Sequence, residues 1–186
     1  VHVVTTEKIH VPVWGTQITT PYVKDEYASV CLRTTILNAG KTELTVVTDI
    51  MDADGQVVST KTNKGVINHG QPFTQNFIVE RPKLWSPETP VLYKAVSKIY
   101  SGDTLLDTYS TRFGIRTIEY IADKGFYLNG KRRKFQGVCN HHDLGPLGAA
   151  INVAALRHQL TLLKEMGCDA IRTSHNMPAP ELVELC

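Results

Sequence analysis

Hydrophobic and polar residues alternate with a period of two along most of the first 118 residues. In the stretch EYASVCLRTTIL, residues 26–37, the residues expected to face inward are Ala28, Val30, Leu32, Thr34 and Ile36. A period of two is typical of a β-strand with one buried face. Further alternations place another set of side chains inward: Leu44, Val46, Ile50, Phe73, Phe77, Val79, Val91, Tyr93, Ala95 and Ile99. The chain is therefore predicted to begin as an all-β structure.

Turn signals separate these strands at regular intervals. They are NAG at 38–40, DADG at 52–55 and SGD at 101–103, and a last strand is expected from 104 to about 113. Roughly seven short strands with a turn every 8–12 residues or so are the pattern of an immunoglobulin-like β-sandwich. We assign residues 14–118 to this sandwich. Residues 1–13 also alternate, and we expect them to form a linker strand.

The pattern changes after Ile118. A small hairpin turned at Asn129-Gly130 is followed by an apolar run, 135–139, and a glycine-rich polar loop. A helix is predicted from about Asn152 to Met166, with Asn152 as N-cap and Gly167 just past its end. A buried strand, 170–172, and a second helix opened by Pro180 complete a βαβα unit, which implies a parallel sheet. Two strands do not complete such a sheet, so residues 119–186 are predicted to be the first part of a larger α/β domain.

Composition narrows the classes of function. The net charge is +2, and the longest basic run is Lys131–Lys134, which argues against a nucleic-acid partner. The four cysteines are widely spaced without a C-x-x-C pair, which favours neither a disulfide framework nor a zinc knuckle. No apolar run of about 18 residues occurs, so no membrane-spanning segment or membrane partner is predicted.

Polar side chains gather directly after both predicted parallel strands. Asn140, His141, His142 and Asp143 follow the first strand, and Arg172, Ser174, His175 and Asn176 follow the second. The carboxyl ends of parallel strands are where α/β folds collect functional residues. The set could bind a metal, but His141 and His142 are adjacent and point to opposite sides of an extended segment. Ser174 and His175 fail as a catalytic dyad for the same reason. The residues could also simply cap strands and helices, or they could bind ring hydroxyls and a carboxylate of a sugar.

Four stretches strongly resemble glycoside hydrolase family 2, which includes β-galactosidases, β-glucuronidases and β-mannosidases. They are LWSPETPVLY (84–93), FGIRTIEY (113–120), GFYLNGKRRKFQGVCNHHDLGPLG (125–148) and LLKEMGCDAIRTSHNMPAPELVELC (162–186). They occur in family order across two domains and cover essentially the whole chain. The resemblance implies an immunoglobulin-like middle domain followed by the start of a (β/α)8 TIM barrel. It also implies that a jelly-roll domain precedes the linker strand.

The resemblance implies roles for individual positions. Residues 137–141, GVCNH, match the family pattern Gly-Val-Asn-x-His, so His141 is expected to contact the glycone sugar, with Cys139 in place of the usual asparagine. Asp143 matches an aspartate that binds sugar hydroxyls in glucuronidase-like members. Residues 172–178, RTSHNMP, match Arg-(Ser/Thr)-Ser-His-Tyr-Pro, with Asn-Met in place of the tyrosine. Arg172 is then the arginine near the nucleophilic carboxylate, and His175 is a second histidine that lines the sugar site.

Members of this family resemble retaining glycosidases, which need a nucleophile and an acid/base carboxylate about 5–5.5 Å apart. No carboxylate of this chain matches either family glutamate, so we expect no catalytic residue within the 186 residues and no hydrolysis by the chain alone. No metal ligands or cofactor are expected in this segment, although the resemblance allows a divalent metal in a full-length parent.

The favoured function of the parent is hydrolysis of terminal β-galactosides, and the expected partner is a β-linked carbohydrate. A β-glucuronidase, a β-mannosidase, or a non-catalytic sandwich module that binds carbohydrate or another partner stays an alternative. Self-association is expected through the surface of the incomplete barrel, where apolar side chains and strand edges lack partners. The sequence leaves the cellular location and the native oligomeric state open.

Overall fold

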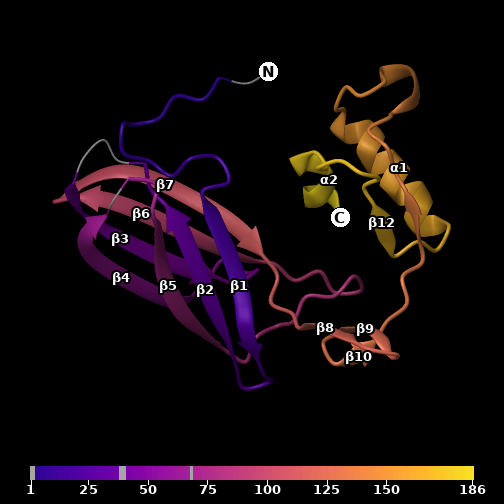
Figure 1. Ribbon diagram of the computed structural model, residues 1–186, viewed down its shortest axis with the longest axis horizontal. Coiled ribbons are helices and arrows are strands. Elements are labelled where there is room, and N and C mark those ends of the chain that lie inside the picture. The colour runs from indigo at the N-terminus through magenta and orange to yellow at the C-terminus, as the bar shows by residue number, and fades with distance from the viewer. Residues whose placement is uncertain (1–2, 38–40, 68) are drawn as a thin grey trace. The chain divides into compact units, whose positions relative to one another are not determined.

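Seven strands form the two sheets of a β-sandwich in the computed structural model, which describes residues 3–37, 41–67 and 69–186. One sheet has the strand order β1-β2-β5, and the other has the order β4-β3-β6-β7, all antiparallel. The two sheets face each other (Figure 1). The strands are β1 (Thr16–Val23), β2 (Tyr27–Thr35), β3 (Thr42–Met51), β4 (Val57–Ile67), β5 (Pro72–Glu80), β6 (Tyr93–Ser101) and β7 (Thr104–Phe113).

The predicted inward residues form the core of this sandwich. Every second residue from Ala28 to Ile36 is fully buried, and the inward set of β3, β5 and β6 is buried or packed against the core. Burial of these side chains supplies the main stabilisation, at about 25 cal/mol per Å² of apolar surface. The alternation in the sequence therefore predicted both the strands and the face that each one buries.

A buried polar band divides the core into two apolar clusters. Thr48, Gln75 and Ser97 occupy inward positions on β3, β5 and β6 and are nearly inaccessible to solvent. The hydroxyl of Thr48 donates to Gln75 Oε1 at 2.7 Å and lies 2.8 Å from the hydroxyl of Ser97. The amide of Gln75 in turn donates to Asn63 Oδ1 at 3.2 Å. Because these buried groups bond to one another, they avoid the cost of an unpaired polar atom.

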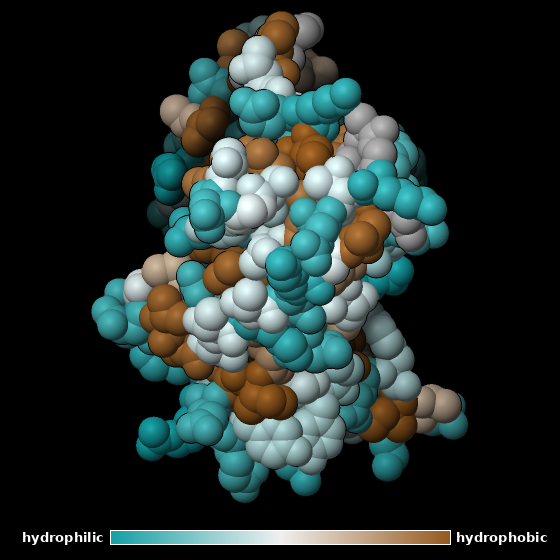
Figure 2. Space-filling view, turned by 90° about the vertical axis from the view of Figure 1, so that its left-hand side faces the viewer, coloured by the Kyte–Doolittle hydropathy of each residue, from teal (hydrophilic) through white to brown (hydrophobic). Residues whose placement is uncertain are grey.

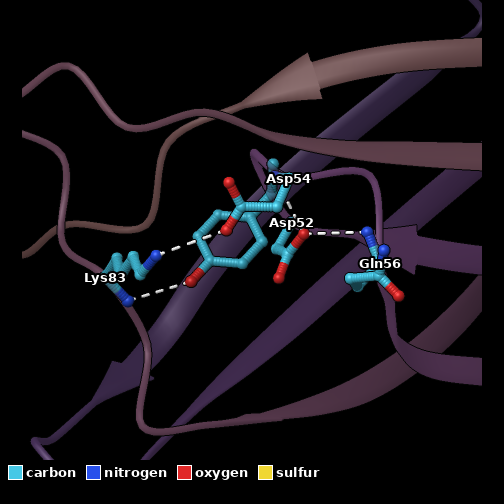
Figure 3. A network of polar contacts seen from close by, with 5 residues as sticks. Asp52, Asp54, Gln56 and Lys83 are labelled. Atoms are coloured by element: carbon cyan, nitrogen blue, oxygen red, sulfur yellow. Dashed lines mark hydrogen bonds and ion pairs between the residues drawn. The ribbon is translucent and has the colours of Figure 1, made fainter.

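The turn between β3 and β4 has the Asp-Gly chemistry that the sequence predicted. Figure 3 shows Asp52 accepting hydrogen bonds from the backbone of Asp54, at 3.0 Å, and of Gln56, at 2.9 Å. Gly55 has a φ of 79°, which a residue without a β-carbon adopts freely. The side chain of Lys83 forms an ion pair with Asp54 at 3.6 Å. The predicted turn at 101–103 is also present, whereas the one at 38–40 lies outside the described residues.

The linker strand expected at residues 1–13 is wrong for the described part of that segment. Residues 3–13 form no strand. Among the described residues, their β-type backbone pairing is limited to an isolated antiparallel bridge between His10 and Leu37. Side chains hold the segment instead. Val11 is buried in the core, and its backbone N–H donates to the Asp107 carboxylate at 2.8 Å. An alternating pattern gives a strand only where the backbone pairs with a neighbour over several residues, and here the pairing is limited to one bridge.

The chain divides into the units Val1–Lys131 and Arg132–Cys186 by its internal contacts. The first unit ends in a small sheet of order β10-β9-β8, which contains the predicted hairpin at Asn129-Gly130. Its strands are β8 (Ile118–Ile121), β9 (Gly125–Leu128) and β10 (Lys131–Arg132). The second unit contains β11 (Gly137–Cys139), the 3₁₀ turn η1 (Gly145–Leu147), α1 (Val153–Glu165), β12 (Ala170–Arg172) and α2 (Pro180–Leu185).

The face of the molecule in Figure 2 shows hydrophobic side chains in small groups separated by polar ones. Among the described residues, neither α1 nor α2 nor any other helix has the length and apolar character needed to cross a bilayer.

Candidate functional site

The strands β11 and β12 pair in parallel, as the sequence predicted. Their register places Gly137 beside Ala170 and Cys139 beside Arg172. The ladder continues past the strands, because the N–H of Asn140 donates to the carbonyl of Arg172 at 2.9 Å. The helix α1 connects the two strands, and its N-cap Asn152 accepts from the N–H of Ala155 at 3.0 Å. The carboxyl ends of both strands therefore lie at one edge of the unit.

An ion pair lies at the opposite, amino-terminal edge of this strand pair. The guanidinium of Arg133 binds the carboxylate of Asp169 at 2.9 Å, and the N–H of Gln136 donates to the same carboxylate at 2.8 Å. The backbone hydrogen bond from Gln136, reinforced by Arg133, lowers the pKa of Asp169 below its usual value. Both side chains are partly exposed, at 19% and 25%, and the contact ties the start of β11 to the start of β12.

At the carboxyl edge, Arg172 contacts two neighbours. Its Nη2 donates to Nδ1 of His175 at 3.2 Å, and its Nη1 lies 3.8 Å from the sulfur of Cys139. A guanidinium carries only donors, so Nδ1 of His175 is the acceptor and Nε2 carries the proton of the neutral ring. The rings of His141 and His175 meet edge to face, with centroids 6.2 Å apart and planes at 84°. Three of the four predicted site residues, His141, Arg172 and His175, are thus brought together.

The fourth predicted residue, Asp143, has its hydrogen bond with the backbone of its own loop. Its Oδ1 accepts from the N–H of Gly145 at 2.8 Å, which opens η1. With His141 it lines a small hollow of about 30 Å³. Apolar side chains from both helices, including Leu156 and Leu182, line the same hollow, whereas Arg172 does not. Capping and sugar binding, the two roles left open for Asp143 by the sequence, therefore involve the same carboxylate.

Gln159 is a site residue that the sequence reasoning missed. It lies on α1 and lines the hollow, and its Oε1 accepts from the side-chain amide of Asn140 at 3.4 Å. A signal was present in the sequence, since Gln159 falls three residues after Leu156 on the apolar stripe of the helix. Polar residues on such a stripe are candidates for a buried or site-facing hydrogen bond.

Within residues 3–37, 41–67 and 69–186, no group of three or more His, Cys, Asp or Glu side chains has an arrangement that could hold a metal ion. The four cysteines are free thiols. Partial burial raises the pKa of the Cys186 thiol.

Comparison with known proteins places this geometry in a family. The family model "Glycosyl hydrolases family 2" matches residues 10–116, and "Glycosyl hydrolases family 2, TIM barrel domain" matches residues 120–186. The beta-galactosidase BoGH2A of Bacteroides ovatus is 46% identical over 97% of this chain and 22% of its own length.

Two solved structures show the same fold. A glycosyl hydrolase family 2 member from Bacteroides cellulosilyticus has a TM-score of 0.92 at 33% identity, over 97% of this chain and 24% of that one. The beta-glucuronidase of Bacteroides uniformis has a TM-score of 0.86 at 32% identity, over 96% of this chain and 23% of that one. The chain thus spans about a quarter of the length of these relatives. The predicted order, an immunoglobulin-like sandwich followed by the start of a TIM barrel, is confirmed, and the chain belongs to glycoside hydrolase family 2.

Proposed function

We propose that this chain contributes the glycone-binding edge of a retaining β-glycosidase, with His141, Asp143, Arg172 and His175 as the residues that bind the sugar. The observation that supports this most strongly is the contact of the two imidazole rings at the carboxyl edge of β11 and β12, 6.2 Å apart. These rings come from segments 34 residues apart in the sequence, and all four side chains are exposed to solvent.

The chemistry of the four groups suits a sugar. His175 offers an Nε2–H donor because Arg172 occupies its Nδ1, and His141 offers a second imidazole beside it. The Asp143 carboxylate accepts hydrogen bonds from hydroxyl groups, which is how proteins select among the hydroxyl configurations of a ring. Together these groups supply both donors and acceptors for one monosaccharide.

A β-galactoside is the substrate we favour, because BoGH2A, at 46% identity over 97% of the chain, is named a beta-galactosidase. A β-glucuronide is the second candidate, and the guanidinium of Arg172 favours it. This group is exposed, and guanidinium groups bind carboxylates in bidentate geometry. The two substrates differ at two positions of the ring. A β-galactoside carries a hydroxymethyl group where a β-glucuronide carries a carboxylate, and its 4-hydroxyl is axial instead of equatorial.

Retaining hydrolysis needs two carboxylates, a nucleophile and an acid/base. Within the described residues, Asp143 is the single carboxylate that lines the hollow. The 186-residue chain is therefore expected to bind a sugar without cleaving it, because loss of the acid/base alone costs about 10²–10⁴-fold. Release of nitrophenol from p-nitrophenyl β-galactoside by the purified chain, above the rate of a His141→Ala, His175→Ala variant, would contradict this expectation.

Binding can be tested by NMR on the chain labelled with ¹⁵N-histidine. Methyl β-galactoside is expected to shift the ring nitrogens of His141 and His175 and to leave those of His158, an exposed residue on α1, unchanged. Methyl β-glucuronide serves as the competing ligand, and tighter binding of this sugar would favour the glucuronidase assignment.

Absence of any histidine shift with either sugar, or equal shifts at all histidines, would overturn the proposed site. Shifts confined to residues of the β-sandwich would favour the alternative of a non-catalytic binding module. A His158→Ala variant is the matched control, because it removes an imidazole from the same unit without touching the strand ends.

A further inference from the structure

Ser174 combines two unusual properties for its place in the fold. Its side chain is polar and only 8% exposed, and among the described residues of Arg132–Cys186 it and Leu156 alone are buried. Its φ is +47°, and no other described non-glycine residue of that unit has a positive φ. A non-glycine residue in the left-handed region persists only where its surroundings hold it there, and such residues cluster at functional sites.

The contact that holds Ser174 joins the two loops at the carboxyl edge. Its hydroxyl donates to the carbonyl of Asn140 at 2.8 Å. The N–H of Asn140 donates to the carbonyl of Arg172, and its side-chain amide donates to Gln159 of α1. The backbone of Asn140 is thus bonded through its N–H to the last residue of β12 and through its carbonyl to the loop that follows, and its side chain is bonded to the helix.

Each end of this contact is followed directly by one of the paired histidines. His141 follows Asn140, and His175 follows Ser174. The left-handed turn at Ser174 reverses the chain, so that Nδ1 of His175 receives the guanidinium of Arg172, two residues before the turn. A shift of the hydroxyl–carbonyl contact would move one peptide against the other and change the separation of the rings.

We infer that Ser174 is a positioning residue that sets the spacing of His141 and His175, so that both imidazoles reach one sugar ring. This inference rests on the proposed function for its purpose, but its geometric part stands without a ligand. The rings now meet edge to face at 6.2 Å. The hydroxyl of Ser174, 2.8 Å from its acceptor, is the side-chain contact that joins the loop of His175 to the backbone of the loop of His141.

Two variants distinguish the effect of losing the hydroxyl from the effect of the strained backbone conformation. Ser174→Ala removes the hydroxyl and keeps the strain of a β-carbon at positive φ. Ser174→Gly removes the hydroxyl and adopts this φ without strain. The matched control is Thr161→Ala, which removes another hydroxyl-to-carbonyl hydrogen bond in the same unit, from Thr161 to Arg157 at 2.9 Å on α1.

The primary measurement is the nuclear Overhauser effect between the ring protons of His141 and His175 in the 186-residue chain. It is expected in the wild type and in Thr161→Ala, and it is expected to be lost in both Ser174 variants while the amide spectrum of α1 is retained. The affinity for methyl β-galactoside is expected to fall about tenfold in both variants, which corresponds to the loss of one well-placed hydrogen bond.

An unchanged nuclear Overhauser effect between the two histidine rings in Ser174→Gly would overturn the positioning role, because the hydroxyl would then not be needed for the spacing. A purely structural Ser174 would lower stability in Ser174→Ala and leave both the ring contact and the sugar affinity unchanged in Ser174→Gly. Failure of the proposed function looks different: the ring contact would respond as expected, and the wild type would bind no sugar.

Discussion

The same substitution at two fully buried threonines of the sandwich is expected to change stability in opposite directions. Thr34 on β2 and Thr48 on β3 are both 0% exposed. Thr48 bonds to Gln75 and Ser97, whereas Oγ1 of Thr34 has no hydrogen-bond partner among the described residues. Valine has nearly the shape of threonine, so Thr→Val replaces only the hydroxyl by a methyl group.

The magnitudes follow from what each hydroxyl leaves behind. In Thr48→Val the carbonyl oxygen of Gln75 loses its 2.7 Å donor in a buried site, and the hydroxyl of Ser97 loses a neighbour at 2.8 Å. A buried polar group left unpaired costs about 1–3 kcal/mol, so we expect a loss of about 2–3 kcal/mol. In Thr34→Val an unpaired hydroxyl disappears from the core, and we expect a gain of about 1 kcal/mol.

Urea denaturation of the 186-residue chain, followed by the fluorescence of the two tryptophans, measures both changes. The midpoint is expected to fall in Thr48→Val and to rise in Thr34→Val, with the slope m unchanged. A double-mutant cycle of Thr48→Val with Ser97→Ala then isolates the energy of their contact. Equal destabilisation by both Thr→Val substitutions would refute the reasoning, since burial alone, and not hydrogen bonding, would then set the cost.

Three further predictions concern the second unit. In Gly137→Ala, a β-carbon would overlap the carbonyl of Ala170, so hydrogen exchange at the β11–β12 amides is expected to become fast, whereas Gly65→Ala, with open space around it on β4, is expected to be neutral. The pKa of Asp169 is lowered in the folded chain, so its contribution to stability is present above its ordinary pKa of 3.8 and is lost as the pH falls through the lower folded value. Asp169→Asn is therefore expected to have a free energy of unfolding lower than that of the wild type by up to about 1 kcal/mol at neutral pH, and so a lower melting temperature. Equal melting temperatures at pH 7 would contradict the role of the ion pair. Finally, exposed apolar side chains such as Met177, 82% exposed, are expected to promote self-association, and a single monomeric species across concentrations in sedimentation velocity would exclude it.

Much of the fold and part of the site could be predicted from the sequence, because both depend on local rules. The period of two fixes which side chains of a strand share a face, so the inward set from Ala28 to Ile36 was identified correctly. The N-cap of α1 and the turn at Asn129-Gly130 follow from residue chemistry within a few positions. The strand-end histidines followed from their position after two predicted parallel strands, and motif resemblance added their role as sugar ligands, which stays a prediction.

Contacts between distant segments could not be predicted in this way. Thr48, Gln75 and Ser97 occupy the inward positions of three alternating strands, but their polarity gave no sign that they bond to one another. That contact depends on which strands become neighbours and at what register, and this is decided only when the two sheets pack. The N-terminal segment shows the opposite case. Its alternation predicted a strand, but the described residues 3–13 pair with the sandwich at a single bridge, between His10 and Leu37.

The sequence by itself determined the strands, the helices, the buried face of the sandwich and the presence of polar residues after two parallel strands. The tertiary structure alone decided that Ser174 reaches Asn140, that Arg172 donates to His175 and that the two imidazoles meet edge to face. The physical reason is range. Propensity and periodicity act over a few residues, whereas the contacts of Ser174 with Asn140 and of His175 with His141 each join residues 34 positions apart, through the parallel register of β11 and β12.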